Sequence, residues 1–339
     1  MRAWVLDEDA DGYRLGDLPA PTIGPWDVQV ALRTSALNHL DLWAAKGMPK
    51  PLSYPHVPGA DGAGVVVDVG QAVEDLSPGA EVVIDPSTSC GRCEACLAGD
   101  IPYCPLFTVI GEHRWGTHAD LVVVPGTNAV RKPEDPSWEQ AGSFGLVVSS
   151  AVRMARRGRI APGSKVLVVG VGGGSASAAF LVATALGAQT YATSRDETTR
   201  AWAIEHGASA VFDSATPYDE ELRAATGGRG VDVVIDNVGA ATFERSLHSL
   251  TKGGRLVTNG STSGRSVDLT LPTLFWRQLE VIGASMNDRM DFAEALRLVA
   301  TGQVEVPAAS IPFDGYPAAL ERLDRGRQIG KLILVRESL

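Results

Sequence analysis

The chain has 339 residues, of which 45% are hydrophobic and 21% charged, and its formal net charge is −10. This length can fill two domains, and the acidic balance excludes partners with a dense negative charge, so we expect neither nucleic acid nor a membrane surface to bind. The first residues lack the basic and apolar stretches of a signal peptide. No run approaches the roughly 20 apolar residues that cross a bilayer, so the expected location is the cytoplasm.

The first part of the chain alternates β-branched residues with breaks at Pro and Gly. Its clearest runs are DVQVALRTSAL (27–37), GAGVVVDVG (62–70), AEVVIDP (80–86) and ADLVVVPG (119–126). Short strands separated by turn residues predict a compact, barrel-like unit made of β-strands.

All four cysteines of the chain lie in one segment, CGRCEACLAGDIPYC, between two of these strands. They are Cys90, Cys93, Cys96 and Cys104. In a large chain without a signal peptide, such clustering favours a thiolate metal site over two disulfides, and four ordinary buried thiols are the alternative.

From about Gly163 the pattern changes to apolar runs that alternate with helical stretches. KVLVVG (165–170) is wholly apolar, as expected of a strand buried on both faces. Five more strand-like runs follow it: AQTYAT (188–193), SAVFD (209–213), VDVVIDNVG (231–239), GRLVTNG (254–260) and LEVIGAS (279–285). This alternation predicts an α/β fold with a doubly wound parallel sheet, and six strands suffice for a dinucleotide-binding domain.

The C-terminal part, from DFAEALRLVATGQVEV to GKLILVRESL, has the pattern helix, strand, helix, strand. Because the nucleotide sheet already has its strands, we expect this tail to return to the first domain. The predicted organisation is a β-rich domain over 1–149, completed by 287–339, and a nucleotide-binding domain over 150–286.

A glycine loop follows the first apolar strand and opens a helix. It comprises Gly170, Gly172, Gly173, Gly174, Ser175 and Ala176. A pyrophosphate at a helix N-terminus needs free backbone N–H groups and no intruding side chains, and this loop supplies both. The strand–turn–helix setting therefore predicts that the loop binds a dinucleotide cofactor. The alternative is a plain turn, which could have the same residues.

The end of the second strand bears on the choice between NADPH and NADH. Ser194 and Arg195 stand there, and a hydroxyl with a guanidinium suits the 2′-phosphate of NADPH. Asp196 follows directly and could bind a ribose hydroxyl instead, so NADH stays open.

Several motifs together resemble the zinc-type medium-chain dehydrogenase/reductases over nearly the whole chain. They are PHVPGADGAGVV (55–66), CGRCEAC (90–96), the glycine loop, DNVG (236–239) and GKLILV (330–335). The resemblance implies a GroES-like catalytic domain, a Rossmann domain, and a homodimer or homotetramer. It also implies that the four cysteines hold one structural zinc per subunit, which leaves no open coordination position for substrate.

The catalytic zinc of the related alcohol dehydrogenases has ligands in three segments. In this sequence the corresponding positions are Asn38, Ala60 and Leu146, and none of them is a usual zinc ligand. The comparison therefore predicts an enzyme that works without a catalytic zinc.

Asn38 and Asp41, in LNHLDLWAAKG (37–47), resemble a segment of the zinc-independent quinone oxidoreductase branch. This implies hydride transfer from NADPH to quinones or α,β-unsaturated carbonyls, a reaction in which the developing enolate needs a hydrogen-bond donor and then a proton. Asn38 is the expected donor and Asp41 is expected to orient it. The proton could come from water or from one of four histidines: His39, His56, His113 and His118.

Further residues are expected at the cofactor beyond the glycine loop. Asn237, Val238, Asn259 and Gly260 lie at the carboxyl ends of predicted parallel strands, where ligands bind in an open α/β sheet, and the resemblance implies that Ser150 and Lys331 also approach the cofactor. Two other functions remain open: an alcohol dehydrogenase or ketone reductase without catalytic zinc, and a catalytically silent NADPH-binding sensor. The sequence leaves the physiological small-molecule substrate undefined.

Overall fold

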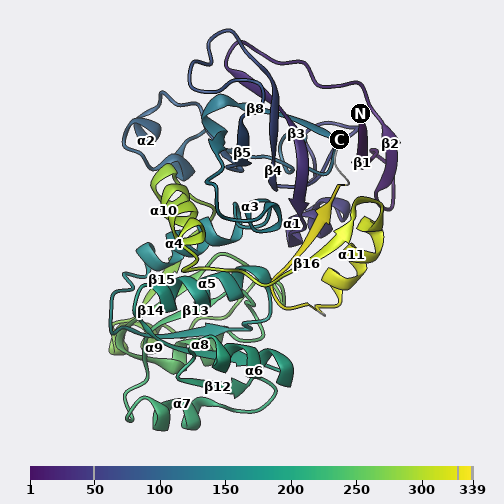
Figure 1. Ribbon diagram of the computed structural model, residues 1–339. Coiled ribbons are helices and arrows are strands. Elements are labelled where there is room, and N and C mark those ends of the chain that lie inside the picture. Colours follow the sequence, from purple (N-terminus) through teal and green to yellow (C-terminus); the bar gives the residue numbers. More distant parts are fainter. Residues whose placement is uncertain (49, 327, 337–339) are drawn as a thin grey trace. The chain divides into compact units, whose positions relative to one another are not determined.

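The computed structural model describes residues 1–48, 50–326 and 328–336. The chain forms two compact units, Met1–Leu146 with Asn287–Leu339 and Val147–Met286 (Figure 1). The second unit begins with helix α4 (Val147–Arg157). The predicted boundary at residue 150 falls inside this helix. Residues 147–150 (VVSS) continue the helical pattern of the residues that follow, and the sequence shows no helix-breaking residue between them.

The first unit is built on a seven-stranded sheet. Six strands run in the order β16-β17-β3-β4-β5-β9, and β8 pairs with β3. Their bounds are β3 Asp27–Ala36, β4 Asp61–Val69, β5 Glu81–Ile84, β8 Leu121–Pro125, β9 Ala129–Arg131, β16 Ala308–Pro312 and β17 Lys331–Val335. Val28, Val30 and Leu32 alternate along β3 into the core, so the period-2 pattern of the sequence is the one that is buried.

Shorter elements surround this sheet. The strands are β1 Arg2–Val5, β2 Arg14–Asp17, β6 Ser87–Thr88 and β7 Thr108–Val109. The helices are α1 His39–Ala45, α2 Glu94–Leu97, α3 Trp138–Ala141, α10 Arg289–Ala300 and α11 Tyr316–Asp324, with 3-10 turns η1 Ile101–Tyr103, η2 Gly126–Asn128 and η3 Phe313–Gly315. Strand β17, in the C-terminal tail, pairs with β3 and so ties the tail into the first unit.

The second unit is a parallel sheet in the order β12-β11-β10-β13-β14-β15. The strands are β10 Lys165–Val169, β11 Gln189–Ser194, β12 Ala210–Asp213, β13 Val231–Asp236, β14 Leu250–Thr258 and β15 Glu280–Gly283. Besides α4, its helices are α5 Gly174–Ala185, α6 Glu197–Glu205, α7 Asp219–Ala225, α8 Phe243–Ser249 and α9 Leu271–Arg277. The predicted α/β fold with a doubly wound sheet is confirmed.

The strand order of this sheet reverses between β10 and β13, which is the position where open α/β sheets bind ligands. Val166, Leu167 and Val168 on β10 are fully buried, as the apolar run predicted. No helix in the described part of the chain is both long and apolar enough to cross a membrane.

Candidate functional site

Three polar side chains from distant parts of the chain meet in the interior of the first unit. Strand β3 lies between β17 and β4; Ile333 and Asp61 both stand opposite Ala36, so Lys331 comes level with Asn38. Asn38, Asp61 and Lys331 are 6%, 0% and 3% exposed. Strand register, rather than proximity in sequence, therefore assembles this cluster.

The cluster is held by short hydrogen bonds. The Lys331 ammonium donates to Asn38 Oδ1 at 2.5 Å and to Asp61 Oδ2 at 2.8 Å. Asn38 Nδ2 donates to Asp61 Oδ2 at 3.0 Å and, at 3.3 Å, to the Ala36 carbonyl. Both amide N–H groups of Asn38 thus have protein acceptors, so the donor role predicted for Asn38 would require one of these bonds to break.

The three positions that correspond to catalytic-zinc ligands gather around Asp61. Asn38 bonds to it, Ala60 precedes it, and the Leu146 N–H donates to Asp61 Oδ1 at 2.5 Å. These positions offer an amide, a methyl and an isobutyl group, while the Asp61 carboxylate already accepts three hydrogen bonds, one of them from an ammonium. This donor set does not fit a catalytic zinc, which needs three protein ligands and an open position.

Asp41 lies behind this cluster and is completely buried. Its carboxylate accepts the backbone N–H of Asn38 at 2.8 Å and that of Gly59 at 3.1 Å. His118 Nε2 is 3.5 Å from Asp41 Oδ2, and its Nδ1 is 3.1 Å from Ser35 Oγ. Asp41 therefore ties the start of helix α1 to the segment before β4, a geometry that suits orientation of Asn38.

The four histidines named as proton donors have different surroundings. His39 is half-buried; burial lowers its pKa, and the nearby charge of Lys331 lowers it further. His56 is buried against the Gly111 carbonyl, and burial lowers its pKa too. His113 accepts the Val109 N–H, and His118 belongs to the buried layer above. Only His39 thus combines partial exposure with the electrostatic influence of Lys331, among the four.

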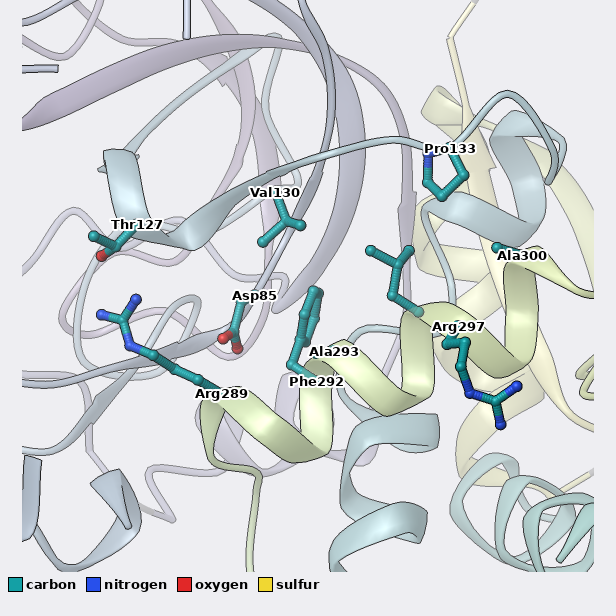
Figure 2. Close-up of a pocket in the computed structure, with 10 residues that line it drawn as sticks. Asp85, Thr127, Val130, Pro133, Arg289, Phe292, Ala293, Arg297 and Ala300 are labelled. Atoms are coloured by element: carbon teal, nitrogen blue, oxygen red, sulfur yellow. The ribbon is translucent and has the colours of Figure 1, made fainter. Parts of the chain in front are cut away.

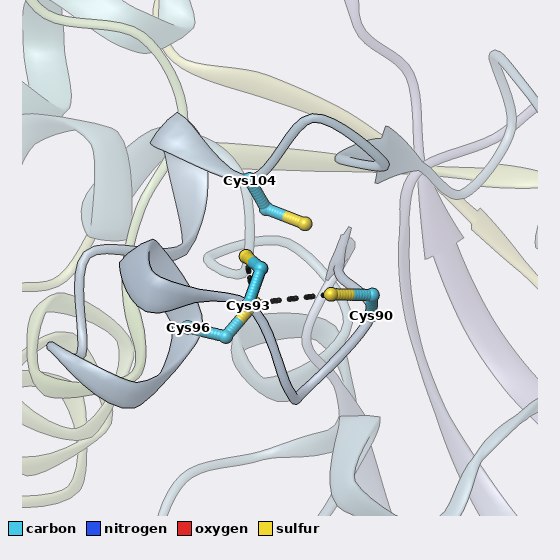
Figure 3. Close-up of side chains that lie close together, drawn as sticks. All are labelled: Cys90, Cys93, Cys96 and Cys104. Carbon is cyan, nitrogen blue, oxygen red and sulfur yellow. Dashed lines mark hydrogen bonds between the residues drawn. The ribbon is translucent and has the colours of Figure 1, made fainter.

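The four cysteines form a second site in the first unit, between β6 and β7 (Figure 3). Their sulfurs all lie within 4.8 Å of one another, and the Cys90–Cys96 and Cys93–Cys96 pairs are 3.8 and 3.5 Å apart. A tetrahedral zinc with bonds of about 2.3 Å sets its sulfurs about 3.8 Å apart, so the four thiols fit this metal. Backbone N–H groups of Arg92 and Cys93 lower the pKa of Cys90 to about 6 and so favour its thiolate, whereas desolvation and the neighbouring thiols raise the pKa of Cys93 to about 11.

The glycine loop of the second unit joins β10 to α5. Gly170 has φ +70°, which a residue with a side chain rarely adopts, and its N–H donates to Thr193 Oγ1. Gly173 is the N-cap of α5, and a Cβ there would meet nothing within 4 Å. The first intrahelical bond runs from Ser177 to Gly173, so the N–H groups of Gly174, Ser175 and Ala176 stay available to an anion.

Asn237 and Asn259 are neighbours at the carboxyl ends of β13 and β14. Asn237 Oδ1 accepts the Asn259 N–H at 3.1 Å, whereas Asn237 Nδ2 is buried without a partner among the described residues. A buried donor without a partner is costly, and a bound ligand with a carbonyl oxygen would satisfy it. Val238 and Gly260 flank this pair, and Ser150 is buried within α4.

Arg195 and Asp196, at the end of β11, are the two residues that could bind the ribose or its 2′-phosphate, and their surroundings differ. Asp196 caps helix α6: its Oδ1 accepts from the Thr199 N–H and hydroxyl, which holds the pKa of Asp196 below its usual value. Ser194 Oγ accepts the Asp196 N–H. Arg195 is exposed and has no bond to a described residue, so its guanidinium is available to a phosphate.

A surface pocket of about 390 Å³ in the first unit contains none of the predicted site residues (Figure 2). It is lined by Asp85, Thr127, Val130, Pro133, Arg289, Phe292, Ala293, Leu296, Arg297 and Ala300. Asp85 Oδ1 accepts from Asn287 Nδ2 and from the Ser87 N–H, and burial raises the pKa of Asp85 to about 7.

Asp85 should make the protein less stable as the pH rises from about 4 to about 7. In that window the folded state keeps a proton that the unfolded state has lost, at a slope of at most about 1.4 kcal/mol per pH unit. Asp85→Asn keeps an oxygen acceptor and removes the titration. Between pH 5 and pH 8 the urea midpoint should therefore fall more for the wild type than for Asp85→Asn. Equal falls in the two proteins would contradict this assignment.

The chain is similar to known dehydrogenases over nearly its whole length. Residues 24–134 match the model of the alcohol dehydrogenase GroES-like domain, and residues 170–301 match that of the zinc-binding dehydrogenases. A crystal structure of an NAD-dependent alcohol dehydrogenase is 38% identical, covers 99% of both chains and superposes with a TM-score of 0.95. The chain belongs to the medium-chain dehydrogenase/reductase superfamily. It is an oxidoreductase, as the sequence predicted.

Two relatives are named as reductases of conjugated CoA thioesters. The acryloyl-coenzyme A reductase of Metallosphaera sedula is 29% identical over 98% of this chain and 99% of its own length. The crotonyl-CoA reductase of Streptomyces avermitilis is 28% identical over 90% of this chain and 78% of its own.

Asn38 and Lys331 were predicted site residues, whereas Asp61 was not. A signal for it was present: Asp61 stands in the apolar run PHVPGADGAGVV, and Lys331 opens the apolar strand KLILV. Opposite charges in two buried strands need partners, and the pair satisfies both.

Proposed function

We propose that this enzyme transfers a hydride from NADPH to the β-carbon of an α,β-unsaturated carbonyl, with conjugated thioesters as the first substrate class. The observation that carries the proposal is the donor set around Asp61. It offers an ammonium donor, that of Lys331, to an enolate oxygen, and it does not offer a ligand set for a catalytic zinc. Quinones, which accept a hydride without a metal as well, are the second acceptor class.

The chemistry agrees with the missing metal ligands. When bound, NADPH supplies the hydride. The electrons of the alkene then move toward the carbonyl oxygen, where hydrogen-bond donors can hold the charge, and water supplies the final proton. A simple ketone is harder to reduce at such a site because its alkoxide would lack a Lewis acid. The likeness to acryloyl- and crotonyl-CoA reductases supports the same substrate class.

Carbonyl reduction is the second candidate. The likeness to an NAD-dependent alcohol dehydrogenase, at 38% identity, favours it and also favours NADH. The geometry of β11 argues against NADH, because the Asp196 carboxylate caps a helix while Arg195 has no partner among the described residues. We therefore propose NADPH as the preferred cofactor.

A homodimer or homotetramer is supported by apolar side chains near the edge of the second unit's sheet. Strand β15 ends the sheet, and Val281 on it is 41% exposed. Helix α9 precedes it with exposed Leu271, Phe275 and Trp276. Such a group of large apolar side chains marks a contact surface.

Product analysis tests the proposed function. Wild type and Arg195→Gln are incubated with crotonyl-CoA and either NADPH or NADH, and the products are separated. We expect butyryl-CoA, with Arg195→Gln raising the KM for NADPH about 10-fold or more and leaving that for NADH unchanged, since a charged hydrogen bond contributes about 1.5–3 kcal/mol. Crotyl alcohol or crotonaldehyde as product would mean carbonyl reduction. Bound NADPH with no product from thioesters, enones or quinones would support the sensor.

A further inference from the structure

Lys331 carries an unused hydrogen-bond donor in the interior of the first unit. Its side chain is 2% exposed, yet a protonated lysine has three N–H groups and only two are bonded, to Asn38 and Asp61. No other described residue accepts the third. A buried donor without a partner is expensive in free energy, so a ligand oxygen is the natural acceptor.

The position of this ammonium is informative. It bonds directly to Asn38, which stands where the related alcohol dehydrogenases have a zinc ligand, and to Asp61, which the Leu146 N–H also holds. A fixed positive charge therefore lies among the residues that would otherwise surround a metal. Asp61 holds the ammonium in place through the 2.8 Å hydrogen bond between Lys331 Nζ and Asp61 Oδ2.

We propose that the Lys331 ammonium is the catalytic electrophile of this enzyme and donates its third N–H to the substrate carbonyl oxygen, in place of the approach to the cofactor that the family resemblance implied. This inference rests on the proposed function. The hydride brings two electrons to the β-carbon, the alkene π pair moves onto the α-carbon and the oxygen, and the enolate oxygen accepts the hydrogen bond. Lys331 keeps its proton throughout. Water then gives a proton to the α-carbon and becomes hydroxide, so the products are the saturated thioester and NADP⁺.

Asn38 acquires a different role in this scheme. Its Oδ1 accepts from the ammonium, while its Nδ2 is bonded to Asp61 and to the Ala36 carbonyl. Asn38 thus positions Lys331 instead of binding the substrate itself. Asp41 fixes the backbone of Asn38 and acts one step further away.

The test removes the donor and separates chemistry from cofactor binding. Lys331→Met should lower kcat for crotonyl-CoA about 100- to 1,000-fold, the effect of losing one donor to a developing oxyanion. The Kd for NADPH, measured by fluorescence titration, should change less than 3-fold. Asp61→Asn/Lys331→Met keeps the buried charge balanced and should show the same kcat loss if the single variant does not fold.

A matched control and a rescue complete the design. Lys132 is also a buried lysine of the first unit, with its side chain 5% exposed, and Lys132→Met should keep the wild-type kcat. In Lys331→Ala, ethylammonium should raise kcat at least 10-fold, whereas tetramethylammonium, a cation without N–H groups, should not.

The outcomes distinguish the hypotheses. An unchanged kcat in the Lys331 variants would overturn the inference, and so would an unchanged kcat with a much weaker NADPH Kd, which would make Lys331 a cofactor ligand. Rescue by tetramethylammonium as strong as that by ethylammonium would also contradict N–H donation. If the wild type itself forms no saturated thioester, the proposed function fails first.

Discussion

Removal of the zinc that we assign to Cys90, Cys93, Cys96 and Cys104 should unfold the loop between β6 and β7 and destabilise the first unit. The wild type should contain one zinc per chain by elemental analysis, and Cys104→Ser should contain less than half as much. We expect a loss on the order of 5 kcal/mol in the free energy of unfolding, a part of the roughly 10–16 kcal/mol with which structural zinc is bound. The remainder of the unit keeps its own core.

The loop itself gives a local measurement. Arg92 is exposed between two of the cysteines, so trypsin should cut there after a chelator has removed the metal and should cut slowly before. Leu106→Ala is the control, because Leu106 is 65% exposed in the same loop and binds no metal. Full stability without zinc would contradict the assignment and leave the cysteines as ordinary thiols.

Asp61→Ala should be the most damaging single change in the buried cluster. It leaves the Lys331 ammonium without its carboxylate and the Leu146 N–H without its acceptor. Removing one partner of a buried ion pair costs about 3–5 kcal/mol, since the remaining charge stays buried without compensation. The urea midpoint of the first unit's unfolding transition should fall accordingly.

A charge on the same strand provides the comparison. Asp68 also lies on β4 but is exposed, and within the described part of the chain its side chain bonds only to the Val69 N–H, so Asp68→Ala should cost less than about 0.5 kcal/mol. Adding Lys331→Met to Asp61→Ala should recover part of the loss. If the double variant is as unstable as the sum of both single variants, the two side chains are not coupled.

The sequence was most informative where chemistry depends on residues that are close together in the chain. The four cysteines lie within one segment, so their spacing alone predicted a common site, and the structure brings their sulfurs within 4.8 Å. The glycine loop was equally readable, because a strand, a turn and a helix follow one another without interruption. Short strand-like runs that alternate with helical stretches sufficed to predict the six strands of the second unit.

The buried cluster depended on the tertiary structure. Asn38, Asp61 and Lys331 belong to three segments that only strand register brings together, and period-2 alternation does not specify which strand pairs with which. The residue types at Asn38, Ala60 and Leu146 were enough to predict that these positions do not bind a catalytic zinc. That the cluster instead contains an ammonium with one unused N–H, and an asparagine whose amide is already bonded, followed from the packing of β17 beside β3, because hydrogen-bond partners are fixed only once side chains are placed.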